Sequence, residues 1–128
     1  MKARITIAAF AALALAAGAA APALAHHSFA MFDFQASKTV TGTVEQFDWT
    51  NPHTFIWLQV PTGAGGATER YGFEGMSPNY LGRRGWSKST LKPGDKVTVI
   101  YHPLKDGSKG GTYQKVQLSD GKELANIG

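Results

Sequence analysis

Short stretches in which apolar and polar residues alternate follow one another through most of the chain. Within Thr39–Trp49, Val40 and Val44 face one side and the threonines between them face the other, as in a half-buried β-strand. The apolar positions change phase near Glu45 and Gln46, so that Phe47 joins the apolar set. A change of phase within one strand predicts a β-bulge or a bend.

The same alternation, with turn residues between the stretches, predicts four further strands. They span Thr54–Val60, Glu69–Glu74, Lys96–His102 and Thr112–Leu118. A turn at residues 120–121 then leads into a short tail.

A short helix is predicted between the third and fourth strands. Ser77 can cap the first amide groups of a helix, and Pro78 suits the first helical position. Gly82 or Gly85 ends this helix after one or two turns.

The order strand, strand, strand, short helix, strand, strand is that of the OB-fold, a small five-stranded, partly open Greek-key barrel. We therefore predict a mainly all-β, OB-like β-barrel over residues 39–128. Residues 26–38 form an N-terminal arm, with Phe29, Phe32 and Phe34 available to dock it. Another small β-barrel or a β-sandwich is the alternative fold.

The first 25 residues have the composition of a signal peptide. Lys2 and Arg4 precede an apolar run, and the sequence over residues 23–25 offers the small-x-small pattern of a cleavage site. The run is only marginally long enough for a membrane span of ~20 residues. We expect a signal-peptide helix that is cleaved after Ala25, or alternatively after Ala23, which gives a periplasmic protein with no membrane span. A retained anchor is the alternative.

Composition narrows the possible functions. The chain has 128 residues and no cysteine, which excludes cysteine nucleophiles, thiol redox catalysis and cysteine zinc sites. Loss of Lys2 and Arg4 lowers the formal net charge of +4 by two, so the charge gives little reason to expect a polyanionic partner. Together with export, this argues against nucleic acid as a partner.

The histidines are the chemically distinctive set: His26, His27, His53 and His102. Cleavage after Ala25 gives His26 both a free α-amine and an imidazole, which can chelate one metal ion. A further imidazole, from His27 or another histidine, completes a three-nitrogen site that suits Cu(II). Cleavage after Ala23 puts His26 in the third position, which also favours copper.

His53 lies in the turn between the first two strands, and His102 ends the fourth. In an OB-fold these two loops border the usual binding face, so we expect the arm to close over both histidines in a metal site. The structural alternatives are a solvated terminus, a turn cap at His53 and an ordinary strand end at His102. Other candidates for a supporting role are Asp33, Asp48, Glu74 and the possible soft ligands Met31 and Met76, which otherwise serve as surface or packing groups.

Aromatic residues suggest a second kind of site. Trp49 and Trp57 are core or face aromatics, and with Tyr101 they are candidates for a face that binds a sugar or another planar ligand.

Several segments together resemble an uncharacterised family of small exported bacterial proteins, the domain-of-unknown-function family 6152. These segments are residues 26–33, 42–44, 49–53, 85–86, 91–97 and 102–107. The resemblance covers essentially the whole mature chain. It implies an exported single domain in which the His-His start, the Asn-Pro-His turn and the His-Pro strand end are family features, and it implies no activity.

The leading hypothesis is an exported binding protein, not an enzyme, that takes copper or another transition metal through His26 and one or more of His27, His53 and His102. The second is a metal-free periplasmic module that binds a small ligand, a glycan or a protein on its aromatic face. The third is a copper oxidase-type enzyme with an N-terminal histidine.

Overall fold

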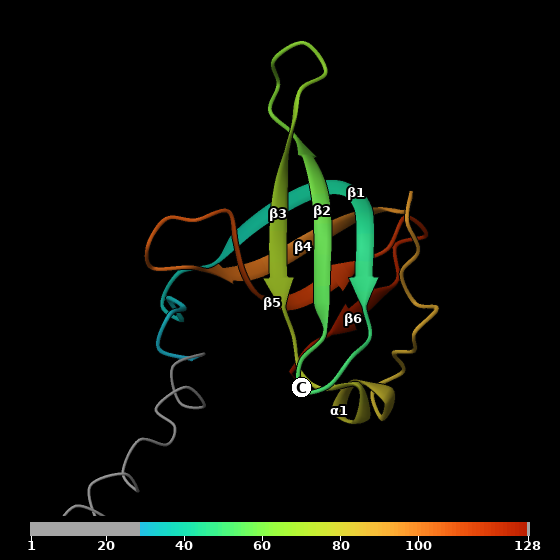
Figure 1. The fold of residues 1–128 in the computed structure, drawn as a ribbon. Helices are drawn as coiled ribbons and strands as arrows, with labels where there is room; N and C mark the ends of the chain where they lie inside the picture. The colour runs from blue at the N-terminus through green and yellow to red at the C-terminus, as the bar shows by residue number, and fades with distance from the viewer. Residues whose placement is uncertain (1–28, 128) are drawn as a thin grey trace, which may run out of the picture.

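In a computed structural model that describes residues 29–127, a curved sheet closes into a small barrel (Figure 1). The neighbouring strands are ordered β3-β2-β1-β4-β5-β6, and a short parallel pairing of β3 with β5 closes the barrel. The strands are β1 (Lys38–Asp48), β2 (Phe55–Pro61), β3 (Thr68–Glu74), β4 (Lys96–Pro103), β5 (Gly110–Gln117) and β6 (Glu123–Ala125), and helix α1 spans Pro78–Gly82.

The predicted OB-like barrel is confirmed. Its five strands follow the predicted order, and α1 lies between β3 and β4. Ser77 caps α1, because its side chain accepts a hydrogen bond from the Tyr80 amide, and a proline occupies the first turn. The predicted tail after residue 121 is wrong: the chain turns at Gly121, which has a φ of 87°, and β6 pairs with β5.

The predicted bulge in β1 is also confirmed. The register of β1 with β2 shifts between Val44 and Gln46. The first half of β1 pairs with β4 and its second half pairs with β2, so the bend lets one strand serve both sides of the barrel. Gly42 permits the close approach of β2, because a Cβ there would lie 2.7 Å from the Gln59 carbonyl oxygen.

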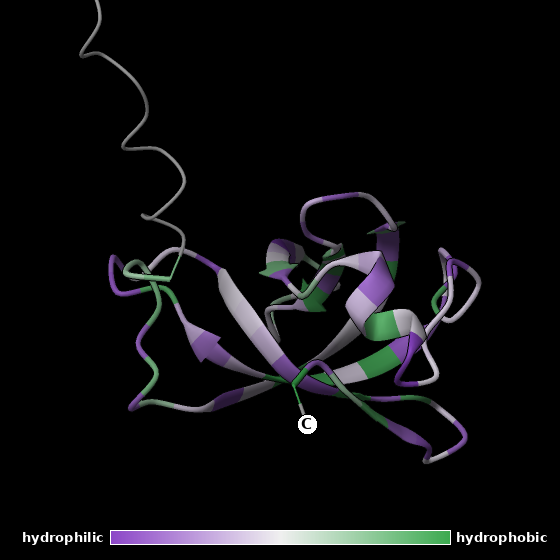
Figure 2. Ribbon diagram, turned by 90° about the horizontal axis from the view of Figure 1, so that it is seen from below, coloured by the Kyte–Doolittle hydropathy of each residue, from purple (hydrophilic) through white to green (hydrophobic). Residues whose placement is uncertain are grey.

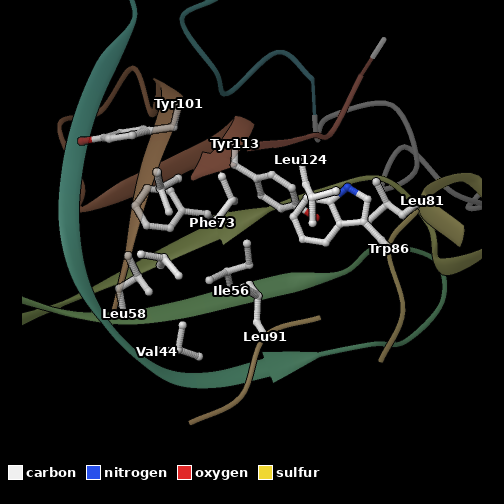
Figure 3. Packing of buried hydrophobic residues seen from close by; sticks show 13 residues of the cluster. Val44, Ile56, Leu58, Phe73, Leu81, Trp86, Leu91, Tyr101, Tyr113 and Leu124 are labelled. Carbon is white, nitrogen blue, oxygen red and sulfur yellow. The ribbon is translucent and has the colours of Figure 1, made fainter. Parts of the chain in front are cut away.

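The core fills the inside of the barrel with side chains from every strand and from the segment around α1 (Figure 3). Phe73 packs edge-on against Tyr101, with ring centroids 4.8 Å apart, and Trp86 packs against Tyr113. Buried residues alternate with more exposed ones along β4. In Figure 2, seen from below, hydrophilic and hydrophobic segments follow one another along the ribbon. This alternation defines which side chains the barrel presents on its outer surface.

The arm, residues 29–37, lies against the outside of the barrel beside the loop between β4 and β5 (Figure 1). Phe32 is only 4% exposed and forms an isolated β-bridge with Leu104. The Asp33 amide donates to the Pro103 carbonyl at 2.8 Å, and the Lys105 amide donates to the Met31 carbonyl at 2.9 Å. The arm is therefore joined to the barrel by main-chain hydrogen bonds as well as by an apolar anchor.

The predicted signal-peptide helix (residues 1–25), with His26 and His27, lies outside the described residues. Among residues 29–127, no helix has the length and apolar character needed to cross a membrane.

Candidate functional site

Four strands present a continuous row of side chains on one part of the outer surface. Phe55 of β2 pairs with Glu74 of β3, Glu74 pairs with Thr112 of β5, and Thr112 pairs with His102 of β4. The neighbours of these residues along the chain, such as Phe73 and Tyr101, point into the core. Because side chains alternate along a strand, the row faces outward.

The arm lies over this row. Phe34 of the arm packs against His102, with ring centroids 5.1 Å apart, and Phe32 packs edge-on against Phe34. We call the row together with the arm residues over it the covered surface. It brings together segments that are more than 60 residues apart in the chain.

A small cavity of about 20 Å³ lies in the covered surface. We call it the His53 cavity. Its wall is mostly apolar and consists largely of aromatic residues of the arm together with Ile127. Its lining residues include Phe29, Phe32, Phe34, His53, Glu74, Met76 and Ile127. A volume of this size accommodates about one water molecule or one metal ion, and it is too small for an organic ligand.

His53 enters the site from the loop before β2, and its orientation is set by Glu74. Its Nδ1 lies 2.5 Å from the Glu74 Oε1, and the side chains are 33% and 15% exposed. A carboxylate at Nδ1 fixes the hydrogen on that nitrogen in the neutral ring and leaves a lone pair on Nε2. Outer carboxylates hold metal-binding histidines in this way in many proteins.

The covering of Glu74 has an electrostatic consequence. Burial raises the pKa of the Glu74 carboxyl above its usual value, and the nearby His53 opposes that shift by favouring the charged form. Burial therefore opposes the charged form of Glu74 that an ion pair with His53 requires.

His102 lies at the same end of the barrel but is engaged differently. Its Nδ1 lies 2.8 Å from the Ala36 carbonyl oxygen, so Nδ1 carries a hydrogen, and the Gln114 amide nitrogen lies 2.7 Å from Nε2. Gln114 in turn accepts a hydrogen bond from the Ser37 hydroxyl through its Oε1. Both ring nitrogens of His102 thus take part in a network that fastens the end of the arm to β4 and β5.

The two histidines border adjacent spaces. A depression of about 240 Å³ is lined by His102, and it shares Phe34, Thr112 and Ile127 with the His53 cavity. His53 and His102 therefore lie on either side of these shared residues. Within residues 29–127, no group of three or more His, Cys, Asp or Glu side chains could hold a metal ion.

The aromatic candidates lie in three different environments. Trp57 lies on the outer surface of β2, stacked on Phe55, with the Arg70 guanidinium 3.9 Å from its ring centroid and its Nε1 donating to Asp48 at 2.9 Å. Trp49 is partly buried and packs against the core. Tyr101 is 4% exposed inside the barrel, so its ring belongs to the core and does not face a ligand from outside.

The surface around Trp57, which the arm does not cover, we call the open surface. Arg70 pairs with Glu45 there through two contacts of 3.0 and 3.2 Å, and Gln59 donates to the same carboxylate. These hydrogen bonds hold the pKa of Glu45 below its usual value, with the bond from Gln59 the largest cause.

Several residues at or beside the covered surface could not be predicted as site residues, because no sequence motif marks them. Thr112, Gln114 and Ile127 reach the site only through the pairing of β5 and the course of the last residues. Asp33, a candidate for metal support, instead accepts a hydrogen bond from the Gln35 amide in a turn of the arm. Of the carboxylates proposed as supports, Glu74 is the one that contacts a candidate ligand.

These features define a small OB-like barrel protein with a histidine–carboxylate pair beneath an aromatic arm. The model of a family of unknown function, DUF6152, matches residues 13–115. The chain belongs to this family, which confirms the resemblance noted from its motifs. Comparison with curated proteins and with solved structures finds no match.

Proposed function

We propose that this protein is an exported, periplasmic binding protein that holds one transition-metal ion, copper in the first place, at the His53 cavity. The observation that carries the proposal is the contact of His53 Nδ1 with Glu74, which leaves Nε2 of a half-buried imidazole as a metal ligand. The small volume of the cavity supports an ion over an organic molecule.

The start of the mature chain supplies the other nitrogen ligands in this proposal. His27 and His26 precede Phe29, which lines the cavity, by two and three residues. An extended chain covers ~3.5 Å per residue, so both histidines are within ~11 Å of Phe29 along the chain. The amine and imidazole of His26, with His53 and His27, then form a nitrogen-rich site that suits copper.

His102 has a different role in this proposal. Because the Ala36 carbonyl and the Gln114 amide engage its two nitrogens, it serves to fasten the arm and is not a ligand. Of the four histidines that the sequence offered as candidate metal ligands, three therefore remain in this proposal.

The test is native mass spectrometry of the protein recovered after export, with one equivalent of copper offered before desalting. We expect a chain that begins at His26 and retains one copper ion. His53→Ala should lose the ion, whereas His102→Ala, which loosens the arm but keeps every proposed ligand, should still retain it with a lower affinity. A wild-type chain that keeps no metal, or a His53→Ala variant that binds as the wild type does, contradicts the proposal.

A second candidate function rests on the border between the open surface and the arm. Phe55, which stacks on Trp57, lines a depression of about 180 Å³ together with Met31, Phe32, Leu104 and other residues. Aromatic faces beside polar side chains suit a glycan or another planar ligand. Trp57 fluorescence that changes with an oligosaccharide, and is indifferent to chelators, would support this function; an unchanged signal would oppose it.

A further inference from the structure

We infer that the His53 cavity selects a soft monovalent metal, Cu(I), and that the Met76 thioether is a ligand beside His53. The inference rests on the proposed metal-binding function and goes beyond it, because it names the oxidation state of the ion and a ligand on the barrel. The ligand class is a soft, singly charged cation, for which Ag(I) is a redox-inert probe.

The main chain of Met76 is fixed at the cavity. It follows β3 directly after Gly75, and it lines the cavity together with His53 and Glu74. Its amide donates to Asn126 Oδ1 at 2.8 Å, and its carbonyl accepts hydrogen bonds from the Thr54 amide and hydroxyl at 3.2 and 2.9 Å. Asn126 and Thr54 are both fully buried, so Met76 is held in place from two segments.

The chain offers few soft donors. It has no cysteine and three methionines, of which Met31 and Met76 lie in the described residues. Thioether sulfur favours Cu(I) over harder divalent ions. Met31 lines the neighbouring depression with Phe55 and Leu104, not the His53 cavity, which makes it a matched control.

The charge of the cavity favours a monovalent ion. Apolar side chains from the arm and Ile127 form much of the wall, and Glu74 is the one carboxylate among the described residues that line it. The cost of moving an ion from water into apolar surroundings rises with the square of its charge. Among the described lining groups, a monovalent cation is balanced by the Glu74 carboxylate, whereas a divalent ion leaves one positive charge uncompensated.

The test compares Met76→Leu with Met31→Leu in the mature chain, since leucine conserves most of the methionine volume. Affinity for Cu(I) and Ag(I) is measured by competition with a chromophoric chelator under anaerobic, reducing conditions, and affinity for Cu(II) and Zn(II) is measured separately. We expect Met76→Leu to weaken Cu(I) and Ag(I) binding at least ~10-fold, and divalent binding less than ~3-fold, because only the soft ligand is lost. Met31→Leu should change none of these affinities.

A second readout does not depend on any substitution. In protein labelled with ¹³C at the methionine methyl groups, Ag(I) should shift the Met76 signal and leave the Met31 signal in place. Met76→Leu that binds Ag(I) as tightly as wild type, or a Met76 signal that does not move, overturns the inference. If copper still binds through His53 in that case, the proposed function stands; if the wild type binds none of the four ions, both fail.

Discussion

Two acidic side chains on the outer surface of the same barrel are paired with basic groups, and the two pairs differ in what surrounds them. Glu74 pairs with His53 beneath the arm and is 15% exposed, whereas Glu45 pairs with Arg70 on the open surface and is 35% exposed. Burial raises the pKa of Glu74, and hydrogen bonds lower the pKa of Glu45. The two pairs differ because arm residues surround Glu74 and not Glu45, and burial opposes ionisation of the covered carboxyl.

The largest expected effect on stability comes from replacing a glycine by alanine next to each of the two surfaces, at Gly75 and at Gly72. A Cβ at Gly75 would lie 2.1 Å from the hydroxyl oxygen of Tyr113. Tyr113 is only 1% exposed, and its hydroxyl shares a hydrogen bond with the Thr54 hydroxyl. Gly75→Ala should therefore lower the free energy of unfolding by about 3 kcal/mol, because the core cannot yield. At Gly72 the obstacle is Trp57, whose ring can move outward, so Gly72→Ala should cost about 1 kcal/mol.

Urea unfolding followed by circular dichroism measures both values. Gly82→Ala is the control, since a Cβ there meets nothing within 4 Å. Equal losses of unfolding free energy in Gly75→Ala and Gly72→Ala would contradict the view that Tyr113 cannot move whereas Trp57 can.

Neutralising each carboxylate should separate the two pairs by their effect on metal binding. Glu74→Gln removes the charge that orients His53, and loss of such an outer partner typically lowers metal affinity ~10- to 100-fold. Glu45→Gln should leave the affinity unchanged, because Glu45 lies on the open surface with Arg70. A copper titration with a competing chelator measures both; a matching loss in Glu45→Gln would mean that the effect is not local.

Removing a fastening group from each surface should give a smaller effect. His102→Ala deletes the hydrogen bond to the Ala36 carbonyl and the contact with Phe34, and it should cost about 1–2 kcal/mol. Arg70→Ala deletes an exposed ion pair and should cost less than about 1 kcal/mol.

Hydrogen exchange identifies where the His102 variant loosens. The amides of Asp33 and Lys105, which join the arm to the barrel, should exchange faster in His102→Ala and not in Arg70→Ala. Unchanged exchange in both variants would show that His102 does not fasten the arm.

The smallest expected effect is on the pH dependence of folding stability in the metal-free protein. Glu45 and Glu74 should contribute to it with opposite signs. The lowered pKa of Glu45 means that its contribution to stability is present above its usual value of 4.5 and is lost as the pH falls. The raised pKa of Glu74 means that the folded state loses stability as the pH rises above 4.5. Urea midpoints of wild type, Glu45→Gln and Glu74→Gln from pH 3 to pH 7 should show each slope disappear in the matching variant.

The fold was largely predictable because its signals are local. The change of phase in β1 and the Ser-Pro start of α1 each occupy a few adjacent residues. β6 was not predicted, because its three residues are too few to show an alternation of apolar and polar positions. Tyr101 alternates as expected in β4, but alternation alone does not reveal which face of a strand points into a barrel.

The site was less predictable because its contacts are distant in the chain. Glu74 was one of three candidate supporting carboxylates, and only the register of β2 with β3 brings it to His53. His102 looked equivalent to His53 in the sequence, since both lie where a strand meets a loop. Its difference depends on Gln114 and on the main chain of the arm, neither of which has a distinctive motif.

Phe29 and Ile127, the first and last described residues, line the same cavity. Both ends of this part of the chain therefore meet at one place on the barrel, opposite the hairpin between β2 and β3 (Figure 1). A polyhistidine purification tag at either end would put foreign imidazoles beside His53 and imitate the activity under test. A tag inserted in the 62–67 hairpin instead lies away from the cavity and leaves the α-amine of His26 free, as the proposed copper site requires.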